Sequence, residues 1–144
     1  MQEVDFDVLA RTIWAEARGE GVAGQVAVGL CIRNRVEADL GHDGKPDWWG
    51  EGYVGVCKAP WQFSCWNKND PNYACLIGAK PIPAAEYARA REAAAVAITS
   101  KEPDLTGGAT HYYSTTMASP PKWTGHPAKR TVKIGRHVFF KDVP

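Results

Sequence analysis

The chain has 144 residues, of which 44% are hydrophobic and 23% charged, as in a folded globular protein with one core. Its formal net charge of +1 gives no overall field that would attract nucleic acid or an anionic membrane. No apolar run approaches the ~18 residues that cross a bilayer, and the acidic residues 1–5 do not resemble a signal peptide. We therefore expect a single domain over residues 1–144, with no nucleic-acid partner and no stable membrane insertion.

Two helices are predicted near the N-terminus. Residues 5–18 form the first, because apolar side chains recur at helical spacing as far as Ala17, and Gly19 is suited to end it. The second covers residues 22–38, with an apolar stripe that leads to Asn34. A polar side chain on an apolar face needs a hydrogen-bond partner, so we expect Asn34 to hold a neighbouring loop.

The middle of the chain is predicted to be less regular. Residues 40–53 have the composition of a loop and contain Trp48-Trp49, which we interpret as a surface flap along a groove. Residues 60–67 alternate aromatic with polar side chains, a pattern that predicts a strand-like segment. Its packed face would consist of Trp61, Phe63 and Cys65, and its other face of Gln62, Ser64 and Trp66.

The C-terminal half combines a helix with short extended segments. Residues 83–100 are alanine-rich and predict a helix that packs closely against another. Residues 109–114 form a short extended piece, and residues 131–140 predict a hairpin that turns near Gly135. The expected fold class is therefore α+β, mainly helical, with a small β-hairpin element.

Glu16 has the strongest chemical signature in the chain. It lies in or near the last turn of the first predicted helix, among apolar neighbours such as Trp14 and Ala17. Apolar surroundings and the negative end of the helix dipole both disfavour a carboxylate and raise its pKa. A carboxylic acid that stays protonated near neutral pH is the proton donor that glycosidic bond cleavage needs. Spacing alone leaves open the alternative that Glu16 is a surface residue paired with Arg18.

Glycosidases that use two carboxylates place a second Asp or Glu across the bond. Nothing in the sequence distinguishes the four candidates, which are Glu20, Asp47, Glu51 and Asp70.

Other kinds of chemistry have weaker support. The four histidines are far apart and no H-E-x-x-H occurs, so no metal site and no cofactor are predicted. A cysteine nucleophile made of Cys65 with His111 or His126 has no favourable spacing. Cys65 and Cys75 could close a small loop as a disulfide in an oxidising compartment, whereas Cys31 is expected to be a buried thiol.

Several motifs occur in a recognisable order. They are residues 10–20 with the core Glu16-Ala17-Arg18-Gly19-Glu20, residues 24–29, Asn34-Arg35-Val36, Cys57, Gln62-Phe63-Ser64, Gly107-Gly108-Ala109, Tyr112-Tyr113 and residues 134–139. In these motifs the sequence resembles the SleB-type cell-wall hydrolases, a group of spore-cortex-lytic enzymes and phage lysins. The likeness covers nearly the whole chain.

The resemblance implies a lysozyme-like fold of the lytic transglycosylase type. It also implies cleavage of the β-1,4 bond between N-acetylmuramic acid and N-acetylglucosamine in peptidoglycan. The catalytic acid of the group carries over to Glu16, which would protonate the leaving oxygen. As a carboxylate it would then take the proton of the muramoyl 6-hydroxyl while a 1,6-anhydro ring closes, so that no second carboxylate is required.

The remaining site residues are interpreted from their types. Gln62, Ser64, Tyr112 and Tyr113 are expected to line the groove and orient the sugar. Glu20 is expected to hold the loop of Glu16 through backbone N–H groups at the start of the second helix.

The resemblance and the apparent lack of an export signal suggest a phage or prophage endolysin. Such a protein is made in the host cytoplasm and acts, as a monomer, on the wall in the periplasm or outside the membrane. Two alternatives stay open, which are a water-using muramidase with a second carboxylate and a non-catalytic glycan-binding module. The 40–53 and Cys65–Cys75 regions depart from the common pattern of the group.

Overall fold

The computed structural model describes residues 2–38, 50, 52–59 and 62–144. The predicted flap with Trp48-Trp49 therefore lies almost entirely outside the described residues, as does Trp61. The longer helices are α1 (Glu3–Ala17), α2 (Val22–Glu37) and α5 (Ala84–Thr99). The shorter helical elements are α3 (Gly52–Lys58), α4 (Tyr73–Leu76) and the 3₁₀ turns η1 (Ser64–Trp66) and η2 (Lys122–Thr124). Among the described residues, no helix combines the length and the apolar character that crossing a bilayer requires.

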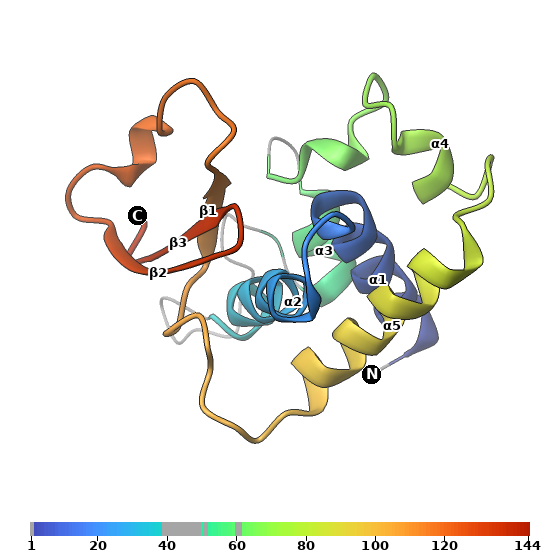
Figure 1. The fold of residues 1–144 in the computed structure, drawn as a ribbon, viewed down its shortest axis with the longest axis horizontal. Helices are drawn as coiled ribbons and strands as arrows, with labels where there is room; N and C mark the ends of the chain where they lie inside the picture. The colour runs from blue at the N-terminus through green and yellow to red at the C-terminus, as the bar shows by residue number, and fades with distance from the viewer. Residues whose placement is uncertain (1, 39–49, 51, 60–61) are drawn as a thin grey trace.

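The described strands form one antiparallel sheet in the order β1-β3-β2. They are β1 (His111–Ser114), β2 (Lys129–Ile134) and β3 (His137–Lys141). The turn between β2 and β3 contains Gly135 with a φ of 59°, a conformation that favours glycine. This confirms the predicted hairpin. In Figure 1, α2 lies between the sheet on one side and α1, α3 and α5 on the other.

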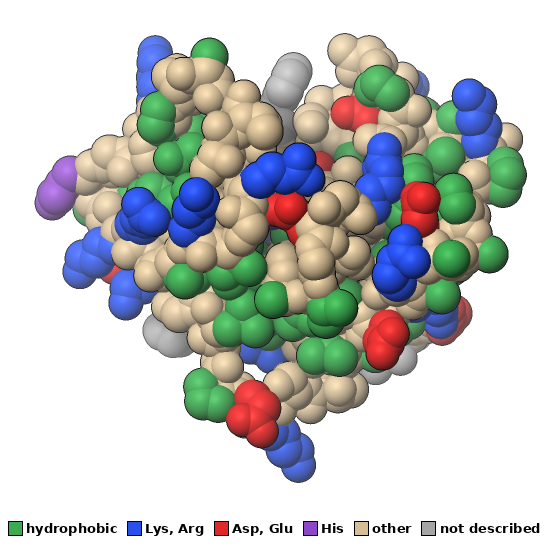
Figure 2. Space-filling view, in the orientation of Figure 1, with side chains coloured by type: hydrophobic (Ala, Val, Ile, Leu, Met, Phe, Trp, Pro, Cys, Tyr) green, Lys and Arg blue, Asp and Glu red, His purple; other side chains and the backbone are tan. Residues whose placement is uncertain are grey.

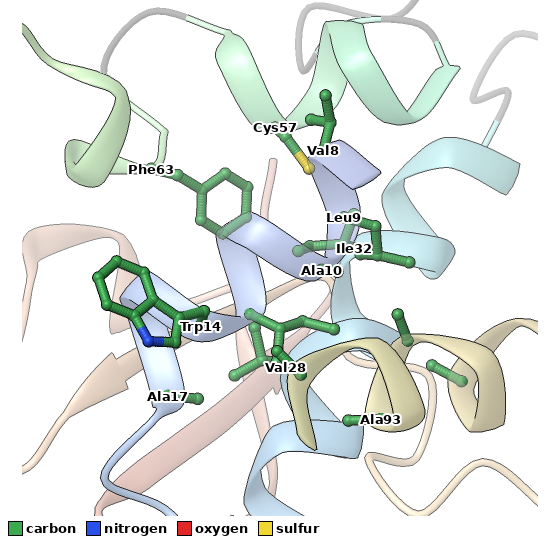
Figure 3. Close-up of a cluster of buried hydrophobic side chains, with 14 of the residues drawn as sticks. Val8, Leu9, Ala10, Trp14, Ala17, Val28, Ile32, Cys57, Phe63 and Ala93 are labelled. Carbon is green, nitrogen blue, oxygen red and sulfur yellow. The ribbon is translucent and has the colours of Figure 1, made fainter. Parts of the chain in front are cut away.

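Helix α1 is central to the main core. Its residues Leu9, Ala10 and Ile13 are completely buried, and removing each large apolar side chain from water is worth about 1.5–3 kcal/mol. Figure 3 shows how side chains such as Val28 of α2 and Phe63 converge on this helix. The burial of α1 thus fixes the position of its C-terminal end.

Helix α2 joins the helical part to the sheet. Its Ala27 and Cys31 pack against Ala109 and Phe139 in a second cluster of buried side chains. The opposite side of α2 packs into the main core. A helix buried on two sides holds the sheet at a fixed place relative to α1.

One predicted element is wrong, one is predicted too long, and one observed helix was not predicted. The described part of the predicted strand, residues 62–67, is not a strand, because Ser64–Trp66 form the 3₁₀ turn η1. The alternation still separates two environments, since Phe63 and Cys65 are buried while Ser64 is exposed. The predicted loop at 40–53 is too long, because α3 already begins at Gly52. The short helix α4 was not predicted.

Asn34 and the pair Cys65 and Cys75 were considered as anchors of loops. The Nδ2 of Asn34 donates hydrogen bonds to Asp104 and to the carbonyl oxygen of Ala109, both at 2.8 Å, which confirms the predicted loop anchor. The four cysteines are free, so the disulfide that the sequence left open between Cys65 and Cys75 is not formed in this structure. Cys65 is buried, whereas the Sγ of Cys75 lies 3.8 Å from the carbonyl oxygen of Pro81.

The close approach of α2 to α5 and α1 depends on Gly29. A Cβ atom there would lie 2.8 Å from the Cβ of Ala97 and 3.1 Å from the Cδ1 of Ile13. Gly55 in α3 is a matched control, since among the described residues only the carbonyl carbon of Gly50 would come near, at 3.8 Å. Both alanine variants gain helix propensity, but only Gly29→Ala overpacks the core.

We therefore expect Gly29→Ala to be less stable than Gly55→Ala by about 1–3 kcal/mol. Urea unfolding of the two variants measures the difference. Equal free energies of unfolding would contradict the packing argument.

Candidate active site

A groove of 570 Å³ lies between the end of α1 and the sheet. Its lining combines the end of α1 and the following turn, the segment around η1, the strand β1 with the loop after it, and the start of β3. Figure 2 shows that this face of the molecule is hollowed between the sheet and the helical part. The six predicted site residues all line the groove: Glu16, Glu20, Gln62, Ser64, Tyr112 and Tyr113.

Glu16 is the penultimate residue of α1, as predicted. Burial raises the pKa of its carboxyl group above the ordinary value. Hydrogen bonds from Tyr112 and Cys65 oppose the rise, and the negative charge of Asp70 adds to it. A partly buried carboxyl group with a raised pKa is suited to hold a proton at the wall of a groove.

The alternative role for Glu16, as a surface partner of Arg18, is wrong. The guanidinium of Arg18 lies over the ring of Trp14, 4.2 Å from its centroid. Trp14 itself is anchored in the core and donates from Nε1 to the carboxylate of Glu86 at 2.9 Å. Arg18 is therefore drawn away along the helix, and the carboxyl group of Glu16 faces the groove.

Tyr112 of β1 contacts Glu16 directly. Its hydroxyl group donates a hydrogen bond to Oε1 of Glu16 at 2.6 Å. The phenol ring packs against His137 and Phe139, with ring centroids at 4.7 and 5.5 Å. Burial raises the pKa of Tyr112 well above its usual value, so the hydroxyl group stays a donor. Sequence analysis placed Tyr112 in the groove but did not predict this contact.

Glu20 holds the β2–β3 turn. Its Oε1 accepts from the backbone N–H of Arg136 at 2.8 Å, and its Oε2 lies 3.3 Å from Nε of the same residue. Burial opposes ionisation, but these hydrogen bonds and the nearby His137 outweigh it and lower the pKa of Glu20. Glu20 was expected to accept hydrogen bonds from backbone N–H groups at the start of α2, but its partner is Arg136. The Nδ1 of His137 is buried and, in the described part of the chain, has no hydrogen-bond partner.

Gln62 is positioned by a residue that sequence analysis did not single out. Arg35 of α2 is buried and donates from Nη1 to Oε1 of Gln62 at 2.9 Å. Its Nε donates to the carbonyl oxygen of Thr110, just before β1. The guanidinium also lies over the ring of Phe63. The motif Asn34-Arg35-Val36 was a signal for this residue, but nothing in its spacing indicated the contact with Gln62.

Ser64 and Tyr113 sit at more open places in the groove. Ser64 is the exposed first residue of η1. Tyr113 lines the groove and also packs against Trp123 and Phe140, with ring centroids at 6.4 and 6.0 Å. Both side chains can offer hydroxyl groups to a polar ligand.

Of the four candidates for a second catalytic carboxylate, two lie among the described residues. Glu20 lines the groove, but Asp70 does not, although its charge affects Glu16. Asp47 and Glu51 lie outside the described residues. Within the described ranges, His, Cys, Asp and Glu side chains form no group of three or more that could hold a metal ion.

The chain is similar to known proteins in both sequence and fold. The family described as Cell Wall Hydrolase matches residues 19–140, so Glu16 lies just before the matched part. A structure of the catalytic domain of the germination-specific lytic transglycosylase SleB from Bacillus anthracis is similar, with a TM-score of 0.70 and 27% identity over 98% of this chain and 97% of that one. The catalytic domain of Bacillus cereus SleB has a TM-score of 0.63 and 26% identity, covering 97% and 91%. The expected mainly helical, lysozyme-like fold is thereby confirmed.

Two curated proteins are similar along most of this chain. The spore cortex-lytic enzyme of Halalkalibacterium halodurans is 29% identical over 136 residues, which is 94% of this chain and 34% of that protein. The enzyme of the same name from Bacillus subtilis is 28% identical over 135 residues, 94% of this chain and 37% of that protein. The chain thus spans about a third of the length of these relatives.

The raised pKa of Glu16 has a consequence for stability. Between the ordinary value of 4.5 and the raised value, the folded protein holds more protons than the unfolded chain. The free energy of unfolding therefore falls as pH rises through that window. Glutamine does not titrate, so we expect Glu16→Gln to increase the free energy of unfolding at pH 7, with the gain disappearing below pH 4.5. Urea unfolding at both pH values measures this.

The exposed Glu102 provides the control, because Glu102→Gln removes one charge without touching the groove. A Glu16→Gln variant that is no more stable at pH 7 than Glu102→Gln would contradict the assignment of a buried, proton-holding Glu16.

Proposed function

Because the chain belongs to the Cell Wall Hydrolase family, we propose that residues 1–144 form a single catalytic domain that degrades peptidoglycan. The bond cleaved is the β-1,4 linkage between N-acetylmuramic acid and N-acetylglucosamine. The mainly helical fold with its groove and the likeness to SleB catalytic domains support this proposal. The observation that carries it is the partly buried carboxyl group of Glu16, which accepts a hydrogen bond from Tyr112 at the wall of the groove.

In the first step Glu16 is the general acid. Its raised pKa keeps a proton available, and that proton passes to the glycosidic oxygen as the bond from the muramoyl C1 to this oxygen breaks. Tyr112 then donates its hydrogen bond to the carboxylate that remains. Because a hydrogen bond to the charged form stabilises it, Tyr112 limits the cost of leaving a charge in a buried place.

In the second step the carboxylate of Glu16 is the base. It takes the proton of the muramoyl 6-hydroxyl group while that oxygen forms a bond to C1, which closes a 1,6-anhydro ring. Glu16 is protonated again at the end, so atoms and charge balance without water. The product is an anhydromuramoyl end, and the reaction is that of a lytic transglycosylase.

The other groove residues orient the substrate. Gln62, Ser64 and Tyr113 provide amide and hydroxyl groups for the sugar and its acetamido group. Glu20 shapes the groove by holding Arg136 and the β2–β3 turn. The protein acts as a monomer on the wall, outside the cytoplasmic membrane, and the phage or prophage endolysin role stays a prediction beside the spore-cortex role that the relatives' names state.

One observation favours a second candidate function. The carboxylate of Glu20 lines the same groove and has a lowered pKa, which is the state a general base requires. A muramidase that activates water with Glu20 would give reducing ends in place of anhydro ends. We place it second because both oxygens of Glu20 are already engaged by Arg136.

Mass spectrometry of the soluble products from purified peptidoglycan tests the proposal. We expect anhydromuropeptides from the wild type and at least about 100-fold slower release from Glu16→Gln, the typical contribution of a general acid. Glu20→Gln is expected to give the same anhydro products. Reducing muropeptides that disappear in Glu20→Gln would establish the water-using muramidase. If the wild type bound peptidoglycan without cleaving it, the alternative of a non-catalytic glycan-binding module would replace the proposal.

The pH profile of Tyr112→Phe provides a separate test of the acid. The phenol hydroxyl lowers the pKa of Glu16, so removing it raises that pKa further. Because the acid must be protonated to act, the alkaline limb of the activity profile should move to higher pH. The rate should fall about tenfold or more, as expected for a lost hydrogen bond to a charged group. An unshifted alkaline limb would show that Glu16 is not the titrating acid.

A further inference from the structure

A second cleft lies on the other side of the Gln62–Tyr112 wall. It has a volume of 190 Å³ and is lined by Arg35, Gln62, His111, Tyr112, Trp123, Val143 and Pro144. Gln62 and Tyr112 also line the groove of Glu16, so the two hollows adjoin. The proposed reaction at Glu16 does not use this cleft.

The cleft contains a buried positive charge. Arg35 is only 4% exposed, and a guanidinium group stays protonated in proteins. Within the described part of the chain, its hydrogen-bond partners are neutral oxygens, those of Gln62 and of the Thr110 carbonyl. Among the described residues, no Asp or Glu forms an ion pair with it.

The acidic groups near Arg35 do not balance its charge. Burial raises the pKa of Cys31 and of Cys57 to about 12, and it raises the pKa of Tyr112 and of Glu16 as well. The two thiols and the phenol are therefore neutral, and burial disfavours the charged form of Glu16. A buried charge is costly unless it is paired, so the position of Arg35 favours an anion.

His111 and Trp123 complete the cleft. Their rings pack together with centroids 5.2 Å apart. Burial, together with the charge of Arg35, lowers the pKa of His111 to about 3, so its ring is neutral. Among the described side chains that line the cleft, Arg35 carries the one positive charge. The rings of His111 and Trp123 form an aromatic wall of the kind on which sugar rings pack.

We propose that this cleft binds a carboxylate carried by a muramoyl residue of the glycan strand, with Arg35 as its ionic partner. Nε and one hydrogen of Nη1 already serve Thr110 and Gln62, so among the described contacts Nη2 and the second hydrogen of Nη1 are left to bind a carboxylate. The NH₂ group of Gln62 is a further donor, because its Oε1 already accepts from Arg35. The muramoyl residue next along the strand from the cleaved bond supplies the ligand. This inference rests on the proposed function, because it names the part of peptidoglycan that the adjoining cleft recognises.

Two sources can supply such a carboxylate, which are the free lactyl group of muramic acid and the peptide stem attached to it. N-acetylmuramic acid represents the first, and an N-acetylmuramoyl dipeptide with one free carboxylate represents the second. The methyl ester of N-acetylmuramic acid and N-acetylglucosamine are matched ligands without the charge. NMR titration of each into the Glu16→Gln protein measures binding without turnover.

We expect the ligands with a carboxylate to bind about tenfold or more tightly than the ester and N-acetylglucosamine, as a charge-assisted pair predicts. Arg35→Met should remove this difference, and Arg35→Lys should restore part of it. Arg33→Met is the matched control on the same helix, because Arg33 contacts the carbonyl oxygen of Ala97 on α5 and lines neither hollow. The stronger of the two charged ligands identifies the source.

Equal affinity of the Glu16→Gln protein for N-acetylmuramic acid and for its methyl ester would overturn the proposal that the cleft binds a carboxylate. The absence of measurable binding of either charged ligand would also overturn it. That comparison does not depend on the folding of an Arg35 variant. Charge-dependent binding that survives in Arg35→Met would also overturn it. The product analysis tests the proposed function separately. If the protein did not cleave glycan but still bound the charged ligands more tightly, the proposed function would be overturned and the proposal for the cleft would stand.

Discussion

The hydrogen bond from the hydroxyl group of Tyr112 to Glu16 joins the two parts of the molecule. Glu16 is fixed by α1, whose apolar side is held in the main core, and Tyr112 is fixed by β1, which pairs with β3. Helix α2 packs against both parts and sets their separation. The groove therefore exists because the helical part and the sheet approach each other at the carboxyl group of Glu16. Any change that moves the sheet relative to α1 acts first on this contact.

The groove places two glutamates in opposite electrostatic conditions. Burial raises the pKa of Glu16, whereas hydrogen bonds from Arg136 lower the pKa of Glu20. Only four positions separate them in the sequence, but the helix ends at Ala17 and the chain turns before Glu20. Pairs of titratable groups with divergent environments are typical of catalytic sites. Here the divergence comes from the end of one helix.

The sequence predicted what local periodicity controls. The first two helices, the alanine-rich helix, the hairpin and the position of Glu16 at a helix end all follow from spacing and from glycine. The segment around Gln62 was assigned the wrong element, because alternation with period two also occurs in a tight turn with one buried side. The contacts of Arg35 and the partner of Glu20 were not predicted, since they join residues from distant elements. Periodicity indicates which side of an element is buried, but it does not indicate what lies opposite.

The order β1-β3-β2 places the last strand at the centre of the sheet. Glu16 and Tyr112 are 96 positions apart, and Glu20 and Arg136 are 116 apart. During synthesis the first helices emerge long before β3 can pair with β1. The groove is therefore assembled only when the C-terminal hairpin has left the ribosome, and an incomplete chain has its acid without the strand that supports it. Under the proposed function, catalytic competence is then one of the last properties the growing chain acquires.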